Sequence, residues 1–281
     1  MTSVKVFDLE GKSAQSVDLP SQFDYAVRPD LIKRAVHALF TLKLQPKGNF
    51  PLAGMQTTAE YFGRRHEPRQ TINTGRSRLP REKLSGSRLG RVRMVPHSMG
   101  GRRAHPPKVA KILVEKINFK ERNIAVCSSI AATAKPEFVK TRGHKIEGLT
   151  LPLVINSSFE QIKRTKDAKA IFDKLGLATD LTRAVEGRRI RSGRSRMRKG
   201  GYRTPKSILI VYGKNDSIWR ATRNIPGVDA IQVEKLDASV LAPGGVPGRL
   251  TLWTVPAIEE LGQKKLFLPT QSVVKSKGEK A

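Results

Sequence analysis

The stretch Ser207-Ile-Leu-Ile-Val-Tyr212 places four branched aliphatic residues in a row between more polar ends. A continuous apolar run of this length is typical of a strand that is buried on both faces, as in parallel sheets. Similar short runs recur at 123–127, 151–155, 229–233 and 250–253. These five runs predict the strands of a mostly parallel sheet.

Helical patterns surround these runs. Arg28-Pro29-Asp30 opens a helix in which apolar residues recur at helical spacing as far as Phe40. Ser158 and Gln161 have the spacing of a capping box for a helix that runs to Leu175. Further helices are predicted at 109–117, directly after 127, at 218–224 and at 256–261, and a short N-terminal strand at 3–9. Alternating strands and helices predict an α/β fold: a single globular domain with a mostly parallel central sheet flanked by helices.

A long segment interrupts this alternation. Residues 46–106 show no sustained strand or helix period and are broken by many Gly, Ser and Pro residues. We therefore assign 1–45 and 107–270 to the globular α/β domain, and 46–106 to an extended, irregular and basic internal loop. Residues 183–206 are expected to form a second basic loop at one end of the sheet, and 271–281 a flexible tail.

Most of the charge lies in two stretches, 64–108 and 183–206. Together they hold 23 Lys and Arg against three acids, a balance of +20 out of the net charge of +29. Like charge concentrated in this way opposes compaction unless a polyanion neutralises it. The preference for Arg points to phosphate, which the guanidinium group grips with two hydrogen bonds. The chain is therefore expected to bind nucleic acid.

The absence of aromatic residues from the first basic stretch indicates which kind of nucleic acid it binds. No aromatic residue lies between Phe62 and Phe119, so the stacking platforms of single-strand-binding domains are missing there. We expect binding to folded RNA through phosphate contacts and guanidinium stacking. The expected RNA-binding residues are Arg64, Arg65, Arg69, Arg76, Arg78, Arg81, Lys83, Arg88, Arg91, Arg93, Arg102, Arg103, Arg188, Arg189, Arg191, Arg194, Arg196, Arg198, Lys199 and Arg203.

Other classes of protein are disfavoured by composition. The single Cys127 excludes an intramolecular disulfide framework, and no signal peptide or membrane-spanning run is present, so we expect a soluble, cytoplasmic protein. No zinc-site spacing, acid pair or activated nucleophile suggests catalysis, and we expect no metal and no cofactor. Gly213-Lys214 lacks the remainder of a phosphate loop, which favours a turn in which Asn215 or Asp216 caps the next helix.

Two alternatives remain open from the residues alone. An RNA-modifying enzyme with an α/β core and an accessory basic loop would need a cofactor pocket at the carboxyl ends of the strands. A free-standing DNA-binding protein would use the same charge on duplex DNA. Neither a membrane nor a small-molecule substrate is expected as a partner.

Several segments resemble the large-subunit ribosomal protein L four family in its archaeal and eukaryotic form. They are Arg28-Pro-Asp-Leu-Ile-Lys-Arg-Ala-Val, Tyr61-Phe-Gly-Arg-Arg, Thr74-Gly-Arg, Pro96-His-Ser-Met-Gly-Gly-Arg-Arg-Ala-His-Pro-Pro107 and Gly187-Arg-Arg-Ile-Arg-Ser-Gly-Arg-Ser-Arg-Met-Arg-Lys-Gly-Gly-Tyr-Arg203. The likeness covers nearly the whole chain in order.

The resemblance implies a structural protein of the large ribosomal subunit, with large-subunit rRNA and neighbouring ribosomal proteins as partners. Its long loop, about residues 45–107, is implied to thread into the rRNA and to reach toward the peptide exit tunnel. The tip is implied to lie between Gln70 and Gly90. The matching segments imply rRNA contacts for Arg64, Arg65, Arg76, Arg78, Arg102 and Arg103.

Overall fold

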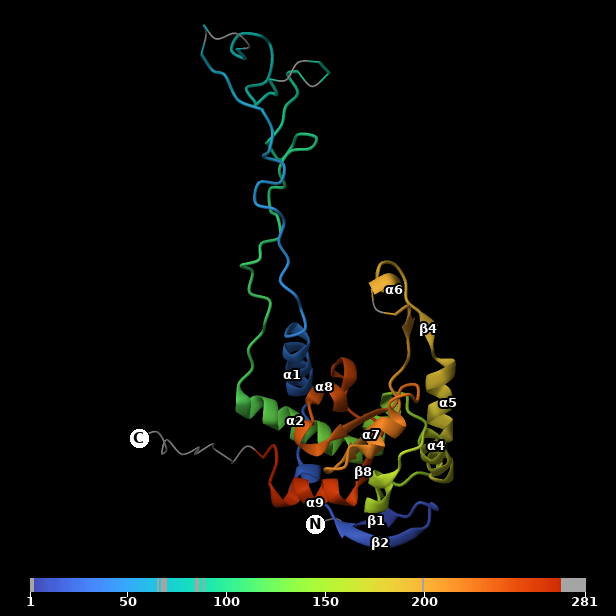
Figure 1. Cartoon of the computed structure of the whole chain (residues 1–281). Coiled ribbons are helices and arrows are strands. Elements are labelled where there is room, and N and C mark those ends of the chain that lie inside the picture. Colours follow the sequence, from blue (N-terminus) through green and yellow to red (C-terminus); the bar gives the residue numbers. More distant parts are fainter. Residues whose placement is uncertain are drawn as a thin grey trace, which may run out of the picture. The chain divides into compact units, whose positions relative to one another are not determined.

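A computed structural model of the chain describes residues 3–64, 66, 70–83, 86, 87, 89–198 and 200–268 (Figure 1). The chain divides into two compact units. One consists of the described residues of Met1–Leu42 and Glu115–Ala281 and is called here the α/β unit. The other, Lys43–Val114, is called the loop unit and contains the first basic stretch.

A six-stranded sheet forms the centre of the α/β unit. Its strands are β1 (Ser3–Phe7), β2 (Ser13–Asp18), β3 (Leu153–Ile155), β6 (Leu209–Tyr212), β7 (Asp229–Gln232) and β8 (Thr251–Thr254). They are arranged in the order β2-β1-β3-β8-β6-β7, in which β1 and β2 are antiparallel and all other neighbours are parallel. The mostly parallel sheet predicted from the apolar runs is therefore confirmed.

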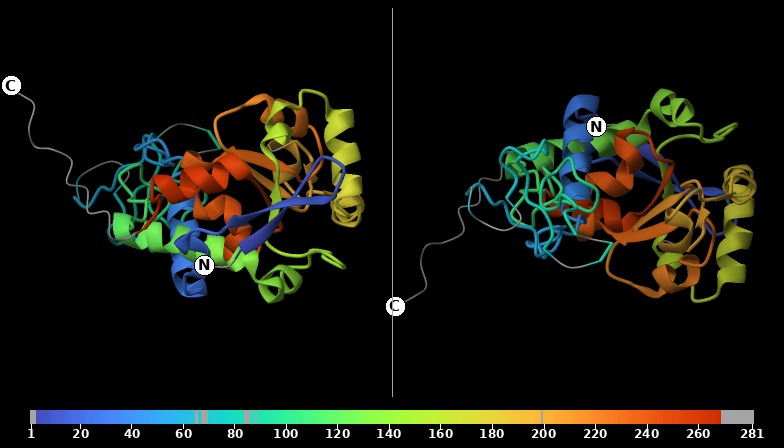
Figure 2. Two further views of the ribbon diagram at one scale, coloured as in Figure 1. Left: turned by 90° about the horizontal axis from the view of Figure 1, so that it is seen from below. Right: turned by 90° about the horizontal axis from the view of Figure 1, so that it is seen from above.

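Helices flank this sheet. They are α1 (Pro29–Thr41), α2 (Phe119–Ala134), α3 (Pro136–Thr141), α4 (Thr165–Lys174), α5 (Ala178–Glu186), α7 (Ser217–Thr222), α8 (Ala238–Leu241) and α9 (Val255–Gln263), with short 3-10 turns at Ser21–Asp24, Ser157–Gln161, Val233–Lys235 and Pro243–Gly245. A further helix, α6 (Ser195–Arg198), lies within the second basic stretch. The α1 helix (blue) and the α2 helix (green) lie against each other in the views of Figure 2.

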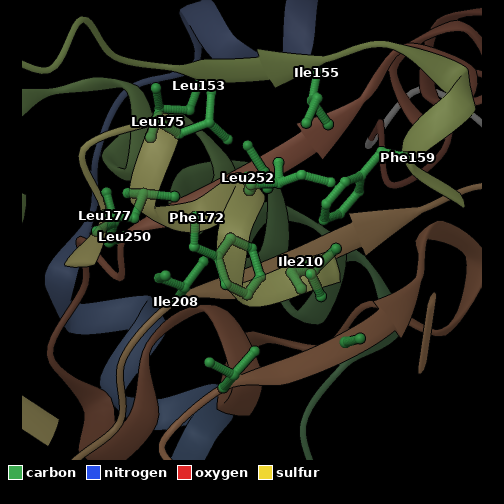
Figure 3. Packing of buried hydrophobic residues seen from close by; sticks show 14 of the residues in the cluster. Leu153, Ile155, Phe159, Phe172, Leu175, Leu177, Ile208, Ile210, Leu250 and Leu252 are labelled. Carbon is green, nitrogen blue, oxygen red and sulfur yellow. The ribbon is translucent and has the colours of Figure 1, made fainter. Parts of the chain in front are cut away.

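Successive strand residues point to opposite faces of the sheet, so each central strand contributes to two cores. Figure 3 shows the first core, in which Ile210 and Leu252 pack against Phe159 and Phe172. Their neighbours along the strands, such as Val211 and Trp253, face the second core with residues of α1, α2 and α9. Burial on both faces explains why the strands read as continuous apolar runs.

Two predictions around α2 are wrong. The strand predicted at 123–127 lies inside α2, and the helix predicted at 109–117 is not formed. The α2 helix is buried almost all round from Ala125 to Thr133, and periodicity alone cannot distinguish such a helix from a buried strand. By contrast, Val109 and Ile112 are exposed, so no packed face stabilises a helix there.

The helix predicted from Ser158 to Leu175 is divided. A 3-10 turn at Ser157–Gln161 precedes α4, and Ile162 between them is extended. Asn156 rather than Ser158 accepts the capping hydrogen bond, from the backbone N–H of Ser157 at 2.6 Å. The β2 strand and the α5 helix were not foreseen.

Candidate nucleic-acid interface

The second basic stretch contains a β-hairpin that joins α5 to β6. Its strands are β4 (Arg189–Ile190) and β5 (Tyr202–Arg203), and α6 lies at its tip (Figure 1). Gly193, Gly200 and Gly201 have φ of 58°, 73° and 76°, a left-handed region that glycine enters at little cost, so they allow the chain to reverse here. The stretch expected to be a loop therefore includes regular structure.

The hairpin has two chemically different faces. Arg189 lies opposite Arg203, and Ile190 lies opposite Tyr202. Residues directly opposite each other in an antiparallel pair share a face. One face therefore carries two exposed guanidinium groups, and the other carries Ile190, Tyr202 and the Arg188 guanidinium, 4.1 Å from the centre of the Tyr202 ring.

A buried carboxylate holds the α5 side of the hairpin root. Asp180 is fully buried in α5 and accepts hydrogen bonds from His144 Nδ1 at 3.1 Å, Arg183 Nε at 2.8 Å and Ser207 Oγ at 2.5 Å. Arg183 also donates to the carbonyl of Lys206 at 3.0 Å. These bonds join the residues just before the hairpin to those just after it.

A second carboxylate holds the β6 side. Asp229, at the start of β7, accepts from Lys206 Nζ at 2.8 Å and from Arg249 Nη2 at 2.6 Å. Arg249 is fully buried and also donates to the carbonyls of Ser207 and Gly227, at 2.9 and 3.2 Å. The two networks are called here the root clamp. They fix both ends of the hairpin to the amino-terminal ends of the β6, β7 and β8 strands.

The two legs of the hairpin also approach each other closely at Gly187. A Cβ atom at this position would lie 2.7 Å from Pro205 Cγ and 2.9 Å from the carbonyl oxygen of Arg183. Any larger residue would push the legs apart, so glycine is required for the close approach rather than for its φ angle.

The ionisation of the root clamp follows from its burial and its hydrogen bonds. Burial by itself raises the pKa of Asp180, but the hydrogen bonds from His144, Arg183 and Ser207 outweigh it and hold that pKa below its usual value. Burial lowers the pKa of His144, although the bond to Asp180 opposes this shift. The bond to Asp180 requires a proton on Nδ1, and Nε2 is buried with no hydrogen-bond partner in the described part of the chain.

We expect the α/β unit to lose stability in acid in two stages. Below the usual His144 pKa of 6.5, the unfolded chain takes up a proton that the folded chain resists. Below the usual Asp180 pKa of 3.8, the stabilising carboxylate is progressively lost as the pH falls toward the lower folded value. Urea unfolding measured between pH 8 and pH 3 should show both declines, and His144→Asn should remove the first. A flat profile above pH 5 in the wild type would contradict this assignment.

The loop unit exposes most of its arginines. Its only buried residues among those described are Ala59, Thr71 and Glu82, so it has almost no apolar core. The residues that present exposed guanidinium groups are Arg64, Arg76, Arg78, Arg91, Arg102 and Arg103. With so little burial, backbone bonds such as the reciprocal pair between Glu60 and Arg81, both 3.1 Å, hold the unit together.

Three of the expected RNA-binding residues have partners inside the loop unit. Arg81 donates to the carbonyl of Gly90 at 2.9 Å and to Ser77, and Arg93 forms an ion pair with Glu82 at 3.5 Å. Lys83 pairs with Glu60 and lies 4.4 Å from the centre of the Phe62 ring. These cations shape the unit as well as adding to its charge.

The remaining expected residues fall into two groups. In the hairpin, Arg188, Arg189, Arg194, Arg196, Arg198 and Arg203 are exposed, and Arg191 is half-buried with its Nε 2.7 Å from the carbonyl of Tyr202. Arg65, Arg69, Arg88, Lys199 and the predicted tail at 271–281 lie outside the described residues.

Sequence reasoning did not single out Asp180, Asp229, Arg249 or Tyr202. Asp229 and Arg249 have their root-clamp partners 20 or more residues away, so nothing local marks them. Asp180 has one local partner, Arg183, but His144 and Ser207 lie 36 and 27 residues away. Tyr202 did carry a signal: it is the one aromatic residue in the second basic stretch.

At the carboxyl end of β6, the backbone N–H that a phosphate loop at Gly213-Lys214 would use is already engaged. The backbone N–H of Gly213 donates to Glu160 at 2.8 Å, and Thr254 donates to the same carboxylate at 2.6 Å. Asn215, as one of the two expected capping residues, accepts from the N–H of Ser217 at 3.1 Å. Within the described ranges, no three His, Cys, Asp or Glu residues are grouped to hold a metal, and no helix is long and apolar enough to cross a membrane.

Comparison with known proteins identifies the family of the chain. The model of the Ribosomal protein L4/L1 family matches residues 17–264. The large ribosomal subunit protein uL4 of Methanocaldococcus jannaschii is 48% identical over 259 residues, which cover 92% of this chain and 98% of that protein. The uL4 proteins of Pyrobaculum aerophilum and Methanosphaera stadtmanae are 45% and 43% identical, over 94% and 93% of this chain and 90% and 97% of their own lengths. With a family match across both basic stretches and the β3, β6, β7 and β8 strands, this chain belongs to the Ribosomal protein L4/L1 family.

Proposed function

We propose that this chain is a structural constituent of the large ribosomal subunit that binds and stabilises large-subunit rRNA. One observation carries the proposal: two stretches hold +20 of the net charge of +29 and expose most of their arginines, while Asp180 and Asp229 at the hairpin root are engaged by cations of the root clamp. Residues 187–206 contain no acid at all. Phosphate is then the natural counter-charge for both stretches.

The two basic regions support binding in different ways. The hairpin is fixed at both ends by the root clamp, so it presents its guanidinium groups in a defined arrangement. The loop unit has little buried surface of its own, so its geometry is completed by the RNA that surrounds it. The relatives are named as large ribosomal subunit proteins, and we infer that the loop unit reaches through the rRNA toward the peptide exit tunnel, with neighbouring ribosomal proteins alongside.

The alternative of an RNA-modifying enzyme receives no support. A cofactor with phosphate groups would need unpaired backbone N–H groups at the carboxyl ends of the strands. Gly213, the candidate for that role, already donates to the buried Glu160. Saturable binding of a nucleotide cofactor by the purified chain would restore the enzyme alternative.

Limited trypsin digestion tests the proposed role of the loop unit. We expect the first cuts in the free protein to fall at exposed arginines such as Arg76, Arg78 and Arg102, because they lie on a unit with almost no core. The α/β unit should be cut later, so large fragments of it should persist after the loop unit has been digested. Mass spectrometry of early time points identifies the sites.

The same digestion is repeated in the presence of large-subunit rRNA. Added at moderate salt, it should slow the cuts in the loop unit at least tenfold, whereas an equal mass of duplex DNA should protect far less. Equal cutting of both units in the free protein, or no protection by rRNA, would contradict the proposed role.

A further inference from the structure

One face of the hairpin is not explained by phosphate binding. Ile190 and Tyr202 lie opposite each other and are 61% and 49% exposed. The β4 and β5 strands pair over two residues each, and a hairpin this short gains little stability by itself. A surface on which an isoleucine and a tyrosine stand exposed side by side is suited to a partner that covers them.

The tyrosine ring is held ready for such a partner. The Arg188 guanidinium lies 4.1 Å from the ring centre, a cation–π contact that limits the movement of both side chains. Arg188 covers part of the ring, and the rest remains open to solvent. Ile190 borders this open area as the cross-strand neighbour of Tyr202.

We propose that Tyr202 stacks on an unpaired nucleobase of the RNA that the hairpin binds. The base lies on the part of the ring that Arg188 leaves uncovered, and Ile190 contacts its edge or its ribose. This inference rests on the proposed rRNA-binding function and adds a base-contacting residue to it. Aromatic stacking on a base is tolerant of sequence, because every base has a π face.

Charge favours RNA over a protein as the occupant of this face. Nine Lys and Arg residues and no acid lie in 187–206. Arg189 and Arg203 occupy the opposite face of the same two strands, where they can follow a phosphate backbone. The alternation of the strands therefore separates two tasks: one face neutralises phosphates, and the other receives a base.

The test compares Tyr202→Ala with Tyr202→Phe in the full-length chain, with binding to large-subunit rRNA measured over a range of salt concentrations. Removing a stacking ring typically weakens binding by about tenfold for each stacked base. We expect that loss for Tyr202→Ala, with an unchanged slope of log affinity against log salt, and near wild-type affinity for Tyr202→Phe. In addition, ultraviolet irradiation of the wild-type complex should yield a peptide that carries a nucleotide on Tyr202.

The double variant Arg189→Gln/Arg203→Gln separates this inference from the proposed function. It should lower the salt slope by about 1.4, because each phosphate of single-stranded RNA that a protein cation neutralises adds about 0.7 to that slope. If the double variant behaves in this way while Tyr202→Ala binds like wild type, the stacking inference is overturned and a protein neighbour covers this face. A lower salt slope for Tyr202→Ala would also overturn it. An unchanged slope in the double variant contradicts phosphate binding by the hairpin instead.

Discussion

Replacement of the six exposed arginines of the loop unit by glutamine should lower the affinity for large-subunit rRNA by about a thousandfold at about 150 mM salt. The residues are Arg64, Arg76, Arg78, Arg91, Arg102 and Arg103. Each phosphate contact releases condensed counterions, and the gain from that release adds up over the contacts. The slope of log affinity against log salt should fall by about four to five at the same time.

A control variant with the same change in net charge distinguishes a localised interface from general attraction. Six exposed lysines of the α/β unit, Lys120, Lys140, Lys163, Lys166, Lys169 and Lys235, are replaced by glutamine. We expect a loss of about tenfold or less, because these cations are dispersed over several helices rather than gathered on one segment. Equal losses in the two variants would mean that net charge alone drives binding.

Asp180→Asn should destabilise the α/β unit by about 3 kcal/mol, the scale seen when one partner of a buried ion pair is removed. The substitution keeps the size of the side chain but removes the charge that Arg183 faces and places an amide N–H₂ among donors from His144, Arg183 and Ser207. Because these bonds close the hairpin root, the affinity of the hairpin for rRNA should fall as well.

Asp173→Asn is the matched control, because Asp173 lies exposed on the neighbouring α4 helix. It removes the same charge and should change the free energy of unfolding by less than about 0.5 kcal/mol. Urea unfolding followed by circular dichroism measures both variants. Similar midpoints for Asp180→Asn and Asp173→Asn would show that the root clamp contributes nothing beyond surface charge.

The central sheet was predictable because its strands are buried on both faces. Runs such as Ile208–Val211 can therefore be recognised in the sequence as continuous apolar segments. The same rule misassigned 123–127, because α2 is buried almost all round from Ala125 to Thr133 and its apolar residues there show no helical period. A continuous apolar run therefore identified the strands correctly, but it could not distinguish a buried strand from a helix that is buried on all sides.

The basic stretches were evident from charge, but their internal organisation was not. Apart from the local pair of Asp180 and Arg183, the root clamp joins residues at least 20 positions apart, such as Arg249 to Asp229 and to Ser207. No local pattern in the sequence records such pairings. The two faces of the hairpin depend on the register of Ile190 against Tyr202. That register follows from where the chain turns between the two strands, at glycines with left-handed φ.

Sedimentation in sucrose gradients tests the proposed function most directly. Cell extract at about 150 mM salt is separated, and the chain is compared with its six-arginine variant by immunoblotting. We expect the wild-type chain to migrate with large subunits and the variant to remain at the top of the gradient. Wild-type protein at the top, or the variant in the subunit fractions at wild-type levels, would contradict an interface built from these arginines.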